Sequence, residues 1–146
     1  MIKLLDVYKQ DKILHKKILK KISSLLKNGE FILGREVQLF ENEYSKYCGS
    51  KYAISWDNGT DALTLALKSL NLPINSEVII PAFTIISCIY PVIRNKLKPI
   101  LVDSDIKNWN LDFDLLKKKI TPKTKCIIAQ HIYGLPVDMN QLMKIA

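Results

Sequence analysis

From residue 52 onward the chain alternates short apolar runs with segments of helical periodicity, and this alternation constrains the fold more than any other feature. The apolar runs lie at residues 52–56, 77–80, 99–103 and 125–129. Runs such as Val78-Ile79-Ile80 are apolar throughout, which is typical of strands buried on both faces. Because helical segments separate the runs, the sequence predicts an α/β fold with a mostly parallel sheet and helices on both of its faces.

Two amphipathic helices are predicted ahead of this region. In residues 11–28 the apolar side chains fall at helical spacing with lysines between them, and the pair Asn28-Gly29 ends the pattern. An apolar loop at 31–34 precedes a second helix, which stops at residues 48–50. The apolar stripe of this second helix consists of Val37, Phe40, Tyr44 and Tyr47.

Polar residues mark the expected helix starts in the alternating region. Thr84 and Asp112 are predicted N-caps, because a side-chain oxygen there can accept from the amides of the first turn. The helix after Thr84 is expected to run to about Arg94 with a kink at Pro91, and the helix after Asp112 to span 113–120.

The net charge of +8 arises from 22 Lys and Arg residues against 14 Asp and Glu residues. Two lysine clusters, at 16–21 and 117–119, are separate and lack the interleaved aromatic residues that stack on bases. We therefore interpret the charge as a lysine-rich surface and expect no nucleic-acid partner, although a nucleic-acid binder is the alternative that the charge suggests. The excess of positive charge can also attract an anionic small molecule.

Several classes of protein are not expected from this composition. No stretch approaches the ~18 uncharged apolar residues of a membrane span, and the start lacks the apolar run of a signal peptide, so a cytoplasmic location and no membrane partner are expected. Cys48, Cys88 and Cys126 show no metal-ligand spacing with the histidines, and no metal site is predicted. Cys88 and Cys126 are expected to be reduced core residues.

The turn between the first apolar run and the helix predicted at 60–70 is a candidate anion site. Asn58-Gly59-Thr60 would place free backbone N–H groups at the positive end of a helix dipole. Many such turns bind nothing, so a plain turn in which Thr60 only caps the helix is the alternative. Neither GxGxxG nor GxxxxGK[ST] is present, which favours a compact phosphorylated cofactor over a nucleotide.

Seven segments occur together in an order and spacing that resemble one family. They are Gly34-Arg35-Glu36-Val37, Gly49-Ser50-Lys51-Tyr52-Ala53, Asn58-Gly59-Thr60-Asp61-Ala62-Leu63, the run from Glu77 to Thr84, Pro99 to Asp103, Ile120 to Lys125, and His131 to Met139. The family is that of the pyridoxal-phosphate-dependent (PLP-dependent) sugar aminotransferases called DegT/DnrJ/EryC1/StrS. The resemblance covers nearly all of the chain from Gly34 onward and well under half of a full-length member. A helix that opens at Asp138 and still continues at Ala146 likewise suggests the first part of a longer protein.

The resemblance implies a type I aminotransferase fold that works as a homodimer. Such enzymes pass an amino group from an amino acid, usually glutamate, to a keto-sugar attached to a nucleotide, in polysaccharide and amino-sugar biosynthesis. PLP is the electron sink, a lysine forms a Schiff base with it, and a carboxylate pairs with its pyridine nitrogen. Residues 1–33 would form an N-terminal helical segment, and residues 34–146 the incomplete N-terminal part of the PLP-binding large domain.

The resemblance assigns cofactor contacts to four residues. Gly59 and Thr60 match the positions that hold the cofactor phosphate, and the adjoining Asn58 shapes the turn. Ile85 matches a position where many members place an aromatic ring over the pyridine, and an aliphatic side chain can press on that ring only by dispersion. No lysine here matches the Schiff-base lysine. No catalytic residue is therefore assigned, and the chain alone is expected to be inactive. A non-catalytic remnant, or a phosphate-ligand-binding or dimerisation module, is the alternative.

The sequence also predicts roles for five further residues. His131 follows a predicted strand and either approaches the cofactor or is a buried, hydrogen-bonded histidine. Trp56, Phe83 and Trp109 are expected to be packing residues. Asp103 ends a predicted strand and is expected to cap a turn.

Overall fold

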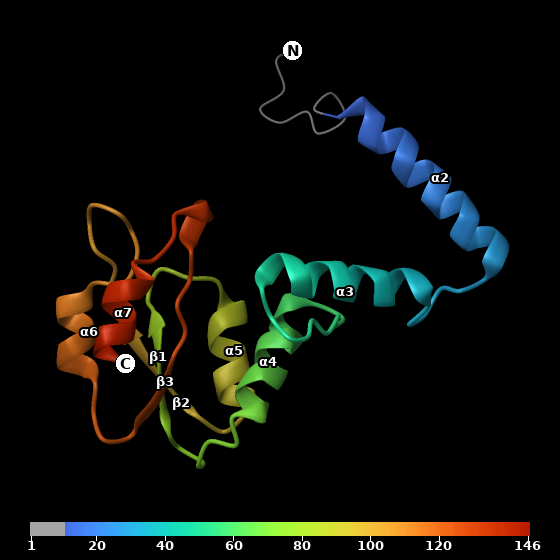
Figure 1. The fold of residues 1–146 in the computed structure, drawn as a ribbon. Helices are drawn as coiled ribbons and strands as arrows, with labels where there is room; N and C mark the ends of the chain where they lie inside the picture. The colour runs from blue at the N-terminus through green and yellow to red at the C-terminus, as the bar shows by residue number, and fades with distance from the viewer. Residues whose placement is uncertain (1–10) are drawn as a thin grey trace. The chain divides into compact units, whose positions relative to one another are not determined.

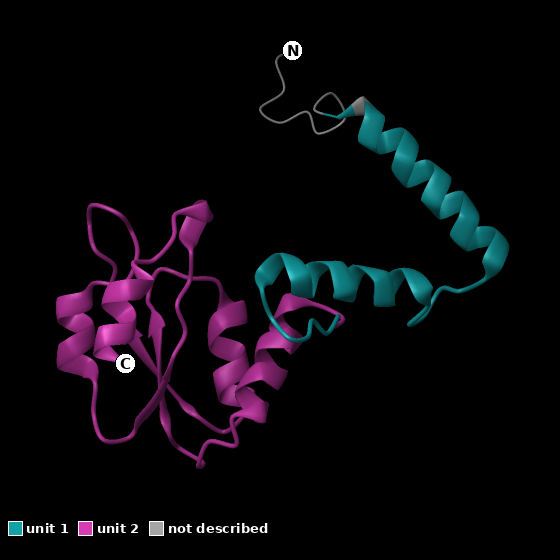
Figure 2. Cartoon of the chain, viewed as in Figure 1, with its two compact units in different colours: residues 1–55 teal, residues 56–146 magenta. Residues whose placement is uncertain are grey.

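The computed structural model describes residues 11–146. The chain divides into two compact units, one that ends at Ser55 and one that runs from Trp56 to Ala146 (Figures 1 and 2). The expectation about a signal peptide concerns the first residues and lies outside the described range. The domain division expected between residues 33 and 34 refers to the complete enzyme and stays a prediction.

The first unit contains the two predicted amphipathic helices. Helix α2 spans Lys12–Asn28, and helix α3 spans Arg35–Cys48. The Asp11 carboxylate caps α2 by accepting from the amide of Leu14 at 2.8 Å. Gly29 and Gly49 end α2 and α3 with φ of 71° and 66°, a left-handed conformation that glycine adopts without steric cost.

The strand predicted at residues 52–56 is absent. The amide of Ser55 donates to the Glu41 carboxylate at 2.6 Å, where a strand amide would donate to a neighbouring strand. Tyr52 and Ile54 are 71% and 81% exposed, so the face of this extended segment that carries them is not covered. The alternating pattern predicts a strand only where a partner lies alongside, and the described residues supply none.

The second unit is built on a parallel sheet. Its strands are β1 (Glu77–Pro81), β2 (Lys98–Val102) and β3 (Thr124–Ile127), in the spatial order β2-β1-β3. Both neighbours run parallel to β1. The predicted strands at 77–80, 99–103 and 125–129 are therefore confirmed to within one or two residues.

Helices cover both faces of this sheet, as predicted. The helices of the second unit are α4 (Gly59–Ser69), α5 (Ile86–Arg94), α6 (Phe113–Lys119) and α7 (Met139–Ile145), with a short 3-10 helix, η1 (Ile132–Gly134), after β3. Figure 1 shows α4 and α5 on one side of the strands and α6 and α7 on the other. In the described part of the chain, no helix is both long and apolar enough to cross a bilayer.

The central strand β1 divides its side chains between two cores. Val78 and Ile80 pack into the cluster under α4 and α5, which also contains Leu67, Cys88, Val92 and Leu97. Ile79 faces the cluster under α6 and α7, with Val102, Leu111, Leu116, Val137 and Leu142. This period of two explains why β1 is apolar at every position. Cys126 packs against the first cluster, and its burial raises the pKa of its thiol.

Of the two predicted N-caps, Asp112 is confirmed and Thr84 is wrong. The Asp112 carboxylate accepts from the amides of Asp114 and Leu115 at 2.9 and 3.0 Å. Asp138 likewise opens α7. Thr84 does not cap α5, because that helix begins after Ile85 and has no side-chain cap.

Candidate functional site

The carboxyl ends of the strands are the place where an open parallel sheet binds ligands. The chain leaves β1 at residue 82, β2 at residue 103 and β3 at residue 128. In Figure 1 the loop after β2 and helix η1 extend at the same end of the sheet. The predicted site residues lie in the second unit, at the start of α4 and in the connection from β1 to α5.

Asn58 closes the first turn of α4. Its backbone is extended, its Oδ1 accepts from the amide of Asp61 at 3.0 Å, and its carbonyl accepts from the amide of Ala62 at 3.0 Å. Asn58 is therefore the helix cap, and the expectation that Thr60 serves as a plain cap is wrong. The amides of Gly59 and Thr60, the first two of the helix, have no acceptor within α4 and lie at the positive end of its dipole.

The space above Gly59 is open. A Cβ built on Gly59 would meet nothing within 4 Å, and the backbone there does not have positive φ. No described neighbour therefore fills the space into which a side chain at this position would extend. Thr60, half-buried beside it, carries the hydroxyl that the resemblance assigns to the phosphate.

Two carboxylates flank this helix start, and both are engaged. Asn58 Nδ2 donates to Asp57 Oδ2 and to Asp61 Oδ2, each at 2.9 Å. Arg94 Nη1 lies 2.7 Å from Asp61 Oδ1 in an ion pair. The guanidinium offsets the negative charge of Asp61 beside the amides, which reduces its repulsion of an incoming anion.

Ile85 occupies the N-cap position of α5 and is 62% exposed. Single exposed aliphatic side chains are common on protein surfaces, so a cofactor contact at Ile85 stays a prediction. Asn58, Gly59 and Thr60 are contiguous at the start of α4, whereas Ile85 belongs to the neighbouring helix that packs against α4. The first turns of α4 contact the carboxyl end of α5, through the Asp61–Arg94 ion pair and the bond from Asn95 Nδ2 to the Thr64 carbonyl, whereas Ile85 lies at the other end of α5.

His131 and Asp103 both make local contacts at the strand ends. His131 is exposed, and its Nδ1 accepts from the amide of Val137 at 3.0 Å. The expectation of a buried histidine is therefore wrong, while the expectation of a hydrogen bond is confirmed. The Asp103 carboxylate accepts from the amide of the next residue, Ser104, at 2.8 Å, whereas the turn that follows β2 is capped by Asp105, whose carboxylate accepts from the amides of Lys107 and Asn108.

The expectation that Phe83 packs in the core is wrong, and Trp56 and Trp109, which were expected to be packing residues, are about half exposed. Trp56 is 54% exposed, and Phe83 and Trp109 are 44% and 53% exposed. Phe83 and Trp109 instead contact each other and Tyr133 beyond the strand ends. Sequence patterns could have indicated this cluster only through the position of each residue shortly after a predicted strand.

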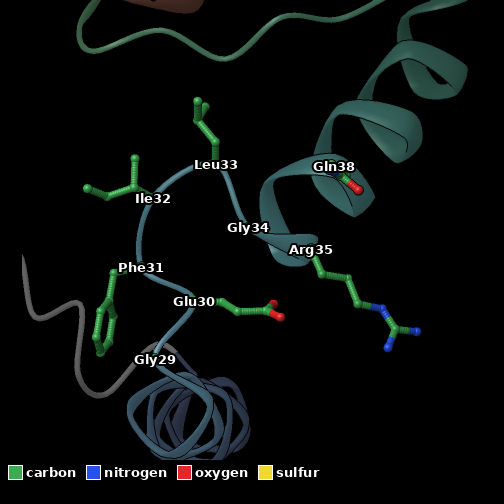
Figure 3. A pocket seen from close by; sticks show the side chains of 8 residues that line it. All are labelled: Gly29, Glu30, Phe31, Ile32, Leu33, Gly34, Arg35 and Gln38. Atoms are coloured by element: carbon green, nitrogen blue, oxygen red, sulfur yellow. The ribbon is translucent and has the colours of Figure 1, made fainter.

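A separate hollow lies in the first unit, in the loop between α2 and α3. Figure 3 shows Glu30 on its concave side, with Phe31 and Ile32 pointing away. Phe31, Ile32 and Leu33 are 66%, 86% and 76% exposed. This hollow contains none of the residues predicted to contact the cofactor.

Residues 12–146 match the model of the DegT/DnrJ/EryC1/StrS aminotransferase family. The chain belongs to this family. Complete members of the DegT/DnrJ/EryC1/StrS family depend on pyridoxal phosphate, and the parallel sheet with helices on both faces is part of their α/β fold.

Two relatives align over the whole chain. One is a dTDP-3-amino-3,6-dideoxy-alpha-D-galactopyranose transaminase of Aneurinibacillus thermoaerophilus, 38% identical over 146 residues. The other is a UDP-2-acetamido-2-deoxy-3-oxo-D-glucuronate aminotransferase of Pseudomonas aeruginosa, also 38% identical. The chain spans only 40% and 41% of their lengths.

Solved structures of the family share this fold. DesV of S. venezuelae superposes with a TM-score of 0.91 at 33% identity, covering 99% of this chain and 39% of DesV. A GDP-4-keto-6-deoxymannose-3-dehydratase, solved with a trapped adduct of PLP and glutamate, gives 0.83 at 32% identity over 87% of this chain and 34% of its own. Because one relative is a dehydratase, family membership does not by itself define the reaction.

Proposed function

We propose that this chain is the N-terminal part of a PLP-dependent aminotransferase that moves an amino group from glutamate to a nucleotide-linked keto-sugar. Relatives named as transaminases of dTDP- and UDP-linked sugars support this reaction. The contribution of the chain would be the phosphate side of the cofactor site, at Asn58-Gly59-Thr60. The product would supply amino sugars for polysaccharide biosynthesis.

The proposal depends most on the glycine at position 59, because no feature of the backbone or of the packing requires a glycine there. The described part of the chain contains all five glycines, and three of them, Gly29, Gly49 and Gly134, have positive φ. At Gly34 a Cβ would lie 2.9 Å from the Glu30 carbonyl oxygen. Gly59 alone has neither constraint, although glycine weakens a helix relative to alanine. A phosphate resting on this amide would explain why no side chain is present.

Each predicted residue has a physical role in this arrangement. The amides of Gly59 and Thr60 would donate to phosphate oxygens, with the Thr60 hydroxyl adding a bond. Asn58 holds the turn, and Arg94 offsets the charge of Asp61. Ile85 would press on the face of the cofactor ring by dispersion. PLP, when bound, supplies the electron sink that stabilises a carbanion.

Titration of the chain with PLP tests this function. Gly59→Ala should weaken PLP binding at least tenfold, because the added methyl group fills the space in which the phosphate would lie. Thr60→Val should weaken it about threefold to tenfold through the lost hydroxyl. Pyridoxal, which lacks the phosphate, should bind equally to all three proteins. Equal affinity of the wild type and Gly59→Ala for PLP would overturn the proposal.

A non-catalytic module is the second candidate, because no lysine in these 146 residues matches the Schiff-base lysine of the family. We propose that the chain alone lacks transaminase activity, and that a complete enzyme would be a cytoplasmic homodimer. Borohydride reduction of the PLP complex distinguishes an aminotransferase from a non-catalytic module. A complete enzyme should retain the cofactor covalently after dialysis, whereas a module without the lysine should lose it.

A further inference from the structure

Three aromatic rings from three different loops meet beyond the carboxyl ends of the strands. Phe83 follows β1, Trp109 lies between β2 and α6, and Tyr133 lies in η1 after β3. The ring centroids of Phe83 and Trp109 are 5.8 Å apart, those of Trp109 and Tyr133 6.2 Å, and those of Phe83 and Tyr133 6.5 Å. These three residues are called the aromatic triad. Rings at such distances support one another's orientation.

The aromatic triad is exposed, although aromatic residues of a domain usually bury most of their area. Trp109 is 53% exposed and Tyr133 is 81% exposed. An open hollow next to the two rings is lined by Lys107, Asn108, Trp109, Ile132, Tyr133 and Leu135. Exposed aromatic groups beside a hollow, at the edge where parallel sheets bind ligands, indicate a binding surface.

The backbone of the aromatic triad is strained at two of its three positions. Trp109 has φ of 60° and Tyr133 has φ of 51°, the left-handed region that bulky residues rarely adopt. Glycine or asparagine would relax both sites. Strain of this kind clusters at ligand-binding sites, where the side chain that causes it is needed for another purpose.

A cation lies beside the rings. Lys107 lines the hollow, and within residues 11–146 its ammonium makes no ion pair. On the same loop, the Asp105 carboxylate accepts from the backbone amides of Lys107 and Asn108 at 2.8 and 3.1 Å. Stacking faces next to a positive charge complement a ligand that has a flat ring and phosphates.

We propose that the aromatic triad and Lys107 bind the nucleoside diphosphate part of the sugar substrate, with the base stacked on Trp109 and Tyr133 and a phosphate beside Lys107. The identity of the ligand rests on the proposed function. Stacking is tolerant of base identity because every base has a π-face. The surface would therefore recognise a nucleotide handle without selecting among uridine, thymidine and guanosine.

Tryptophan fluorescence provides the test. In a Trp56→Phe background Trp109 is the sole tryptophan, and titration with UDP should quench it. In all variants the UDP affinity is measured by calorimetry. Trp109→Gly and Tyr133→Ala should raise the Kd for UDP at least tenfold, and Trp109→Tyr should keep it within threefold. Tyr52→Ala, at a tyrosine that is 71% exposed in the first unit, is the matched control and should leave the Kd unchanged.

Trp109→Gly also separates binding from folding. Glycine relaxes the left-handed backbone at this site, so the circular dichroism of the variant should match that of the wild type while UDP binding is lost. Lys107→Gln should weaken UDP at least threefold and leave uridine unaffected, because only UDP carries the phosphates.

Three results would overturn the proposal. The first is a folded wild type that does not bind UDP, and the second is a Kd for UDP that the substitutions in the triad leave unchanged. The third is a wild-type dimer that Trp109→Gly dissociates without any effect of UDP, which would show that a second copy covers the rings. A failure of the proposed function would give a different pair of results. Gly59→Ala would then bind PLP as the wild type does, while Trp109→Gly would still lose UDP binding.

Discussion

The two ends of the parallel strands, called here the amino edge and the carboxyl edge of the sheet, differ in how completely their polar groups are paired. At the amino edge, the buried Glu77 carboxylate accepts from the Thr121 hydroxyl at 2.6 Å and lies 3.4 Å from Lys98 Nζ. The backbone amide of Glu77 donates to the Lys123 carbonyl at 2.8 Å. These contacts join β1 to β2 and to the turn before β3, so this edge serves stability.

The carboxyl edge is left incomplete. Among the described residues, the buried side-chain atoms without a hydrogen-bond partner are Thr84 Oγ1, Ser104 Oγ, Asn110 Oδ1 and Gln130 Oε1. All four follow the end of a strand, as do the two strained aromatic residues. Buried polar atoms without partners cost free energy, so an edge that collects them is suited to binding rather than to stability. A ligand would therefore complete the carboxyl edge rather than the amino edge.

The largest expected effect is on the core that both edges share. Ile79 is fully buried at the centre of β1, and Ile79→Ala should lower the free energy of unfolding by about 2–5 kcal/mol through lost burial and a cavity. Ile106→Ala, at a residue that is 90% exposed beyond β2, should change it by less than about 0.5 kcal/mol. Urea denaturation followed by circular dichroism measures both. Similar losses in the two variants would show that this core does not hold the sheet together.

A pH-dependent loss of stability is expected at the amino edge. The Thr121 hydroxyl, opposed by desolvation and helped by Lys98, holds the pKa of the Glu77 carboxyl below its usual range. Its contribution to stability is therefore present above the unfolded pKa of about 4.3 and is lost as the pH falls through the lower folded pKa. Thr121→Val should lower the Tm clearly at pH 7 and much less at pH 2. An equal decrease at both pH values would contradict this assignment.

The same substitution at the carboxyl edge should have the smallest effect. The Thr84 hydroxyl has no partner, so Thr84→Val removes a buried polar atom without breaking a hydrogen bond. In the absence of ligand, the free energy of unfolding should stay the same or rise by up to about 1 kcal/mol. Chemical denaturation of Thr84→Val and Thr121→Val side by side compares the edges directly. A loss at Thr84 as large as that at Thr121 would remove the distinction between them.

The fold could be predicted because its signals are local. The apolar run through Ile79 marks a strand buried on both faces, and Asp112 caps α6 with its own side chain. The prediction was wrong at residues 52–56, where a strand needs a partner that the sequence pattern cannot reveal. It was also wrong at Thr84, because α5 begins one residue later than expected, after Ile85, and has no side-chain cap.

The site could be predicted only in part, for the same reason. The turn at Asn58-Gly59-Thr60 is contiguous, so its residue types identify it. The cluster of Phe83, Trp109 and Tyr133 depends on three loops that meet only in the folded chain. Nor does the sequence show that Asp61 is paired with Arg94, 33 residues away.

The central claim is that the amides of Gly59 and Thr60 bind the phosphate of PLP. Titration of the 15N-labelled chain with PLP, followed by two-dimensional NMR, tests it most directly. The account predicts that the largest amide shifts occur at Gly59 and Thr60 and that pyridoxal without phosphate does not produce them. If these two amides stay in place while PLP shifts others, the phosphate binds elsewhere and the account is contradicted.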